Sequence, residues 1–106
     1  MKLLSKLFVE ESWVCAVNHC GDNGFFKPVV CQKGYCAADP FLYSADGQDI
    51  YMFVELTDIK KSKSRIGVKK VYPTEDREFK TIIESPSHLS YPNIFKYNEK
   101  IFMIPE

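Results

Sequence analysis

Short runs of aromatic and β-branched residues, separated by polar turns, follow one another along most of this 106-residue chain. Strand-like runs occupy 40–43, 50–55, 64–72 and 77–85. The first two flank Asp46-Gly47, which is a strong signal for a hairpin turn. The one helical pattern lies at 2–11, where four apolar residues share a face and predict a short helix.

Part of this pattern occurs twice in the sequence. The two passages are ADPFLYSADGQDIYMFVE (38–55) and SYPNIFKYNEKIFMIPE (90–106). Pro92 follows Pro40 by 52 positions and Glu106 follows Glu55 by 51, so the copies differ by one residue in the turn. Asn98 suits a left-handed position in the second turn. Each copy therefore predicts a hairpin, and a repeat of about 50 residues is typical of propeller blades.

Four antiparallel strands in about 50 residues correspond to one blade of a β-propeller. We therefore predict an all-β chain of propeller-type blades, of which it holds about one and a half. This leaves a strand edge unpaired, and we expect a homo-oligomer in which self-association covers the exposed edges. The predicted parts are an N-terminal extension (1–11), a leading β-hairpin (12–36), a first blade (37–86) and the inner hairpin of a second blade (87–106).

The composition narrows the possible partners. Fourteen basic residues balance fourteen acidic ones, so the net charge gives no support for binding nucleic acid or an anionic membrane. The basic run at 60–65 is best explained as a solvated loop, because no aromatic side chains are interleaved with it. The first residues lack the pattern of a secretory signal, and no apolar run approaches the ~20 residues of a membrane span. These features favour a cytoplasmic location.

The four cysteines leave several interpretations open. They are spaced C-x4-C-x10-C-x4-C, at Cys15, Cys20, Cys31 and Cys36. Buried, unpaired thiols are favoured, because Cys15 lies within an apolar run and thiols stay reduced in the cytoplasm. A zinc site is a second alternative, although the four residues between each pair of cysteines are at the upper limit of the spacing between paired zinc ligands. Disulfides are the third alternative. No Gly-rich phosphate loop occurs, and we expect neither a cofactor nor a metal.

The hairpin geometry predicts a cluster of polar side chains. Because the open ends of a hairpin lie side by side, Asp39 should be close to Glu55, and Tyr91 close to Glu106. With His88, these side chains should gather at one opening between the two copies. They could cap backbone amides, bind a ligand, or supply the two carboxylates that hydrolysis of a glycosidic bond requires.

The sequence motifs ADPF, FVE, HLSYP and MIPE occur in an order and at a spacing that resemble those of a known family. Residues 12–106 resemble the first part of a five-bladed β-propeller domain related to the family-43 glycoside hydrolases. That domain also occurs at the N-terminus of glucosamine inositolphosphorylceramide transferases and in bacterial formyltransferase-like and polysaccharide-biosynthesis proteins. The matching segment begins with the strand that contains Trp13, Ala16 and Val17.

The resemblance implies a function in carbohydrate recognition or processing. In the related hydrolases the aspartate of ADP is the catalytic base, and the matching residue here is Asp39. The family pattern implies a second acid where this chain has Ser90-Tyr91-Pro92, and a third from a later blade. We therefore expect a fragment of a carbohydrate-active domain that binds glycan, with Glu55, His88, Tyr91 and Glu106 as ligand contacts, and is inactive alone. The alternatives are a non-catalytic glycan-binding or assembly module and a self-associating gene remnant.

Overall fold

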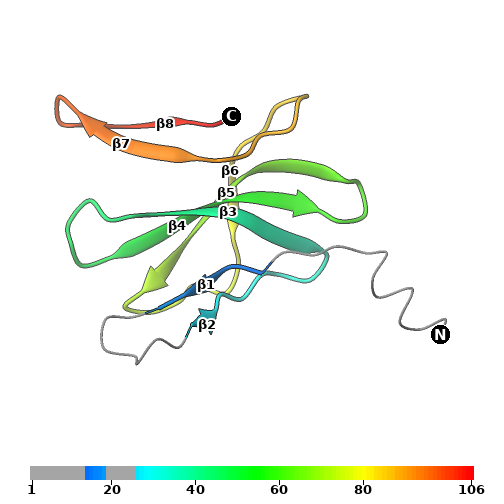
Figure 1. Ribbon diagram of the computed structural model, residues 1–106, viewed down its shortest axis with the longest axis horizontal. Helices are drawn as coiled ribbons and strands as arrows, with labels where there is room; N and C mark the ends of the chain where they lie inside the picture. The colour runs from blue at the N-terminus through cyan, green and yellow to red at the C-terminus, as the bar shows by residue number, and fades with distance from the viewer. Residues whose placement is uncertain (1–13, 19–25) are drawn as a thin grey trace.

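The computed structural model describes residues 14–18 and 26–106, and every regular element in these ranges is a β-strand (Figure 1). All strand pairs are antiparallel, which confirms the predicted all-β class. The helix predicted at 2–11 lies outside the described residues. Nothing in the described ranges forms a helix that could cross a membrane.

The central sheet is a four-stranded meander in which each strand pairs with the next along the chain. Its strands are β3 (Tyr35–Tyr43), β4 (Ile50–Asp58), β5 (Lys63–Tyr72) and β6 (Lys80–Ile83). The two-stranded sheets are β1 (Ala16–Val17) with β2 (Lys27–Pro28), and β7 (Asn93–Tyr97) with β8 (Lys100–Ile104). Figure 1 shows the central sheet between these two smaller sheets.

The main cluster of buried apolar residues lies on one face of the central sheet. Strand β4 alternates buried and partly exposed positions, and the side chains of Met52, Val54 and Leu56 are almost completely buried. Burying an apolar side chain of this size contributes roughly 1.5–3 kcal/mol. Four residues from other parts of the chain pack with them. Cys15 precedes β1 and Val29 follows β2, whereas Ala37 belongs to β3 and Phe79 precedes β6.

The two similar passages fold as equivalent hairpins, as predicted. In each, the ladder is interrupted at a residue that precedes proline: Asp39-Pro40 in the first hairpin and Tyr91-Pro92 in the second. The pairs on the two sides of the interruption are Ala38–Glu55 and Phe41–Phe53 in the first hairpin, Ser90–Glu106 and Asn93–Ile104 in the second. The duplicated sequence therefore encodes a duplicated backbone, including a bulge at the same place in both copies.

The turns of the two hairpins differ. In the first, the Asp46 carboxylate accepts hydrogen bonds from the backbone N–H groups of Gln48 and Asp49 at 2.8 and 2.9 Å, and these bonds lower its pKa. The second turn consists of Asn98 and Glu99, both with positive φ (49° and 61°). Two such residues between paired strands form the tight turn that matches the twist of a hairpin, so the predicted left-handed position of Asn98 is confirmed.

A buried lysine joins the central sheet to the chain segments that cover its core. The side chain of Lys69 in β5 is 0% exposed, and its ammonium group lies 2.6 Å from Oε2 of Glu75. The same nitrogen donates to the carbonyl oxygens of Val30 and Asp76 and lies 5.0 Å from the centre of the Phe79 ring. Since a buried charge requires partners, these contacts hold the segment after β2 and the segment between β5 and β6 against the central sheet.

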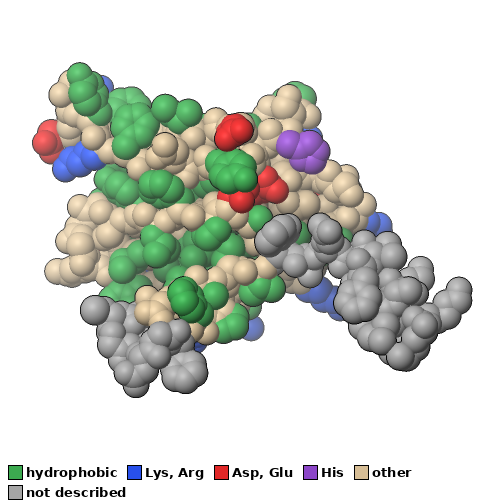
Figure 2. Space-filling view, viewed as in Figure 1, with side chains coloured by type: hydrophobic (Ala, Val, Ile, Leu, Met, Phe, Trp, Pro, Cys, Tyr) green, Lys and Arg blue, Asp and Glu red, His purple; other side chains and the backbone are tan. Residues whose placement is uncertain are grey.

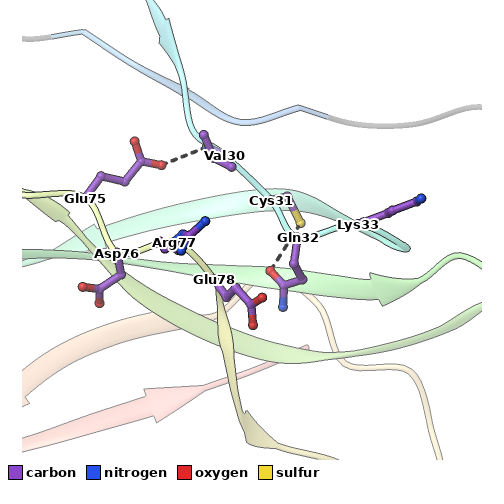
Figure 3. Close-up of a pocket in the computed structure, with 8 residues that line it drawn as sticks. All are labelled: Val30, Cys31, Gln32, Lys33, Glu75, Asp76, Arg77 and Glu78. Atoms are coloured by element: carbon purple, nitrogen blue, oxygen red, sulfur yellow. Dashed lines mark hydrogen bonds between the residues drawn. The ribbon is translucent and has the colours of Figure 1, made fainter.

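Two further sets of hydrogen bonds strengthen this junction. Glu75 also accepts a hydrogen bond from the backbone N–H of Val30 at 2.9 Å (Figure 3). The side-chain amide of Gln32 pairs with the backbone of Phe79 in both directions, at 2.9 and 3.0 Å. Residues 30–33 and 75–78 thus face each other across a hollow of about 690 Å³.

We expect the substitution Glu75→Gln to destabilise the fold by roughly 3 kcal/mol, because it leaves the Lys69 ammonium buried without its counter-ion. Urea unfolding followed by circular dichroism measures this free energy. The matched control is Glu78→Gln, an exposed carboxylate on the same hollow, which we expect to change the free energy of unfolding by less than about 0.5 kcal/mol. Equal effects of the two substitutions would show that the ion pair does not stabilise this junction.

The same ion pair predicts a pH dependence. Burial raises the pKa of Glu75, but hydrogen bonds from Lys69 and Val30 and the positive charge of Lys69 outweigh burial, so the pKa lies below its ordinary value of 4.5. The stabilisation is therefore present above the unfolded-state pKa and is lost as the pH falls through the folded-state pKa. Urea unfolding between pH 7 and pH 3 should show a smaller loss of stability for Glu75→Gln than for the natural chain.

Candidate functional site

A cleft lies where the two hairpins meet, between β3 and β7, which are in contact. Its volume is about 360 Å³. Each copy contributes the same three positions to its walls: Asp39, Pro40 and Phe41 from the first, Tyr91, Pro92 and Asn93 from the second. The two bulges form this cleft. Of the five side chains predicted to gather at one opening, Asp39 and Tyr91 line it, whereas Glu55, His88 and Glu106 do not. Figure 2 shows acidic side chains gathered near the middle of the displayed face, beside a histidine.

The first cleft position has a strained backbone in both copies. Asp39 has φ of 51° and Tyr91 has φ of 48°, in the left-handed region that favours glycine. Each also precedes a proline, which restricts its backbone further. Such conformations persist only where surrounding structure holds them, and they concentrate at functional sites. Both of these strained residues, Asp39 and Tyr91, line the shared cleft.

Asp39 lies close enough to Glu55 to affect its ionisation. Burial raises the pKa of Glu55 above its ordinary value of 4.5, and the negative charge of Asp39 raises it further. Hydrogen bonds from the Ser64 and Thr57 hydroxyls and the charge of His88 act in the opposite direction without reversing the shift. Glu55 therefore keeps its proton more readily than an ordinary glutamate.

His88 is joined to this group through β5. Its Nδ1 atom accepts a hydrogen bond from the backbone N–H of Ser64 at 3.3 Å, and Ser64 shares a 2.8 Å hydrogen bond with the hydroxyl of Thr57. The two hydroxyl residues are paired across β4 and β5. Sequence reasoning missed both, although their opposite positions in consecutive strands were a signal that could have found them.

The exact pairing differs from the sequence prediction by one residue. Glu55 pairs with Ala38 rather than Asp39, and Glu106 exchanges two backbone hydrogen bonds with Ser90 rather than Tyr91. The reason is the bulge, which inserts residues on one strand only and shifts the ladder. Asp39 and Tyr91 line the cleft, and Glu55 interacts with Asp39. Glu106 is exposed and is not among the residues that line the cleft.

The described cysteines do not form a metal centre. Cys15, Cys31 and Cys36 are free thiols, and Cys20 lies outside the described residues. Within the described part of the chain, no three histidine, cysteine or acidic side chains are grouped so that they could hold a metal ion. Burial, followed by the charges of neighbouring groups, raises the pKa of Cys15 to about 11. This thiol is a protonated core residue that donates to the carbonyl oxygen of Ala37 at 3.4 Å.

Comparison with known proteins identifies the family. Residues 26–106 match the family described as "Glucosamine inositolphosphorylceramide transferase 1, N-terminal". The chain belongs to this family. Glucosamine inositolphosphorylceramide transferase 1 from Oryza sativa subsp. indica and that from subsp. japonica are each 38% identical to it over 71 residues. The matches cover 65% of this chain and 9% of each relative, and no solved structure matches.

The matched range of the transferase N-terminal family contains the whole candidate site. Both cleft walls, Glu55, Thr57, Ser64 and His88 fall within residues 26–106, and so do Lys69 and Glu75. The cleft and the ion pair that stabilises the sheet beside it are therefore both parts of the family domain. Cys15 lies before the matched range, although it packs into the same core.

We expect Asp39→Asn to lower the pKa of Glu55, because the substitution removes a negative charge that disfavours ionisation of the second carboxyl. NMR titration of the Glu55 side-chain carboxyl measures this pKa directly. Asp49→Asn, in the turn of the same hairpin, is the matched control and should leave the Glu55 titration unchanged. An unaltered Glu55 titration in Asp39→Asn would show that the two carboxylates do not share a site.

Proposed function

We propose that this chain is the glycan-binding portion of a glycosyltransferase-associated domain, and that the cleft between the two bulges binds the sugar. The observation that carries the proposal is the pairing of Asp39 with Tyr91 at equivalent strained positions on opposite walls of one cleft. Membership of a transferase N-terminal family supports it. The chain is proposed to bind without turnover.

The chemistry of the walls suits an amino sugar. The Tyr91 side chain is 58% exposed, so its ring offers an apolar face on which the C–H groups of a sugar ring could stack. The carboxylate of Asp39 supplies hydrogen-bond acceptors and negative charge, which favour hydroxyl groups and a protonated amine. The names of the rice relatives include glucosamine, so we take glucosamine as the first ligand to test.

The architecture we propose for the domain is that of propeller blades. The β3–β6 meander would be one blade, and β7–β8 the inner hairpin of the next. In support, the two hairpins share their register and bulge, and β7 lies beside β3, the first strand of the meander. A ligand site on the inner strands of neighbouring blades is consistent with the resemblance to glycoside hydrolases.

Acid–base catalysis on a glycosidic bond is the second candidate function. The proximity of Glu55 and Asp39 favours it, because glycoside hydrolysis uses a pair of carboxyl groups, and burial raises the pKa of Glu55 above its ordinary value. Against it, the second copy has Tyr91 where the hydrolase pattern has an acid. This candidate predicts slow hydrolysis of an aryl glycoside that disappears in Asp39→Asn.

The binding proposal predicts that Tyr91→Ala weakens glucosamine binding by about three- to tenfold, since the stacking face is lost. We would measure the affinity by two-dimensional NMR titration of the labelled chain with glucosamine. Tyr97→Ala is the matched control: Tyr97 belongs to the same hairpin and is 64% exposed, but it does not line the cleft. This control should bind like the natural chain.

N-acetylglucosamine tests the electrostatic part, because acetylation removes the positive charge. Its binding should be weaker than that of glucosamine in the natural chain, and the difference should shrink in Asp39→Asn. The proposal is wrong if glucosamine perturbs no resonance of residues 39–41 and 91–93, or if Tyr91→Ala and Tyr97→Ala bind equally well.

A further inference from the structure

The outer edge of β8 has no partner among the described residues. Strand β4, its equivalent in the first copy, pairs with β3 on one side and β5 on the other, whereas β8 pairs with β7 alone. Ile101 and Ile104 are more than half exposed, and Phe102 is 41% exposed. Figure 1 shows β8 on the side of β7 away from the central sheet, and Figure 2 shows apolar side chains over this hairpin.

The hydrogen-bonding capacity of this edge follows from the register. Ser90 and Glu106 exchange two backbone hydrogen bonds. Because successive residues of a strand direct their N–H and C=O groups to opposite sides, the even-numbered residues of β8 direct theirs toward β7. The open edge therefore presents the backbone N–H and C=O groups of the odd-numbered residues: Ile101, Met103 and Pro105. Pro105 has no N–H, which leaves two amide donors between Lys100 and Pro105 for a partner strand.

A strand along β8 would form one hydrogen bond fewer than β5 forms along β4. Val54 in β4 faces β5 and pairs with Gly67, and the residue equivalent to Val54 in the second copy is Pro105. A β5-like strand along β8 would lose the hydrogen bond that this position donates. The edge instead suits a short strand that requires donors only from Ile101 and Met103.

We propose that this strand is β8 of a second copy of the chain, paired antiparallel about a two-fold axis with Phe102 opposite the partner's Phe102. Ile101 then exchanges two hydrogen bonds with the partner's Met103, and symmetry repeats the exchange. All outward amides are used, and none is needed from Pro105. Shifting the register to place Met103 on the axis would set Ile101 against the partner's Pro105 and lose a donor.

The side chains favour the same register. Phe95 and Phe102 already stack, with ring centroids 5.6 Å apart and planes 19° apart. The two phenylalanines on the axis would occupy a non-hydrogen-bonded pair, the closest cross-strand position, and extend this stack across both hairpins. Glu106 would lie diagonal to the partner's Lys100, within reach of an ion pair on each side of the axis. The product is a four-stranded sheet in which each β8 is an inner strand.

The dimer and the proposed sugar site are independent. The cleft lies between β3 and β7, on the opposite side of β7 from the open edge. Loss of sugar binding would therefore leave the dimer intact, and a monomeric variant would keep its cleft.

Sedimentation velocity over a range of concentrations tests the proposal on the 106-residue chain. The natural chain should show a reversible monomer–dimer equilibrium. Phe102→Lys should weaken the dimer by about a hundredfold, because it places two ammonium groups in the closest cross-strand pair. Phe95→Lys is the matched control: it removes the same ring stack and adds the same charge away from the axis, and should weaken the dimer roughly threefold.

Met103→Pro provides a second variant that leaves the apolar side chains of Phe102 and Ile104 in place. It removes an outward amide that β7 does not use, and it should also give a monomer, with circular dichroism confirming that the strands remain. A natural chain that stays monomeric at every concentration would overturn the proposal. So would a dimer that tolerates both Phe102→Lys and Met103→Pro, because its interface would then lie elsewhere.

Discussion

The ammonium group of Lys69 is the constraint on which the described fold most depends. A fully buried cation is tolerated only with close partners, and those partners are Glu75 and two backbone carbonyls from the segments that follow β2 and β5. The contacts of Lys69 with these partners hold both segments against the central sheet. It thereby places Val29 and Phe79 over the apolar face of β4. A polar interaction thus determines where the apolar cover lies.

On this stable sheet, the two bulges create the candidate site. Each bulge forces a residue before proline into a left-handed conformation and shifts the ladder beside it. The shift moves Asp39 and Tyr91 out of the regular cross-strand positions and into the cleft between the hairpins. Glu55 stays in the ladder behind Asp39, where burial keeps its proton affinity high. The strain and the position of Asp39 and Tyr91 therefore have one origin, the bulge.

The sequence predicted what depends on local pattern. Alternating apolar residues and the Asp-Gly and Asn turns were sufficient to predict both hairpins, and hairpin symmetry predicted the neighbourhood of Asp39 and Glu55. Three features depend on tertiary contacts and could not be predicted. The bulge displaced the pairing by one residue, Lys69 lies inward although Lys69-Lys70 suggests a solvated pair, and the bond from Ser64 to His88 joins a strand to a distant loop.

The equivalence of Asp39 and Tyr91 has an evolutionary consequence. Both occupy the same position of a repeated backbone frame, so a substitution at either one changes a single wall of the cleft. Selection can alter either wall by one codon without rebuilding the loop that carries it. A repeated backbone frame can therefore carry two different walls, and a single substitution is enough to make the two sides of the cleft unlike.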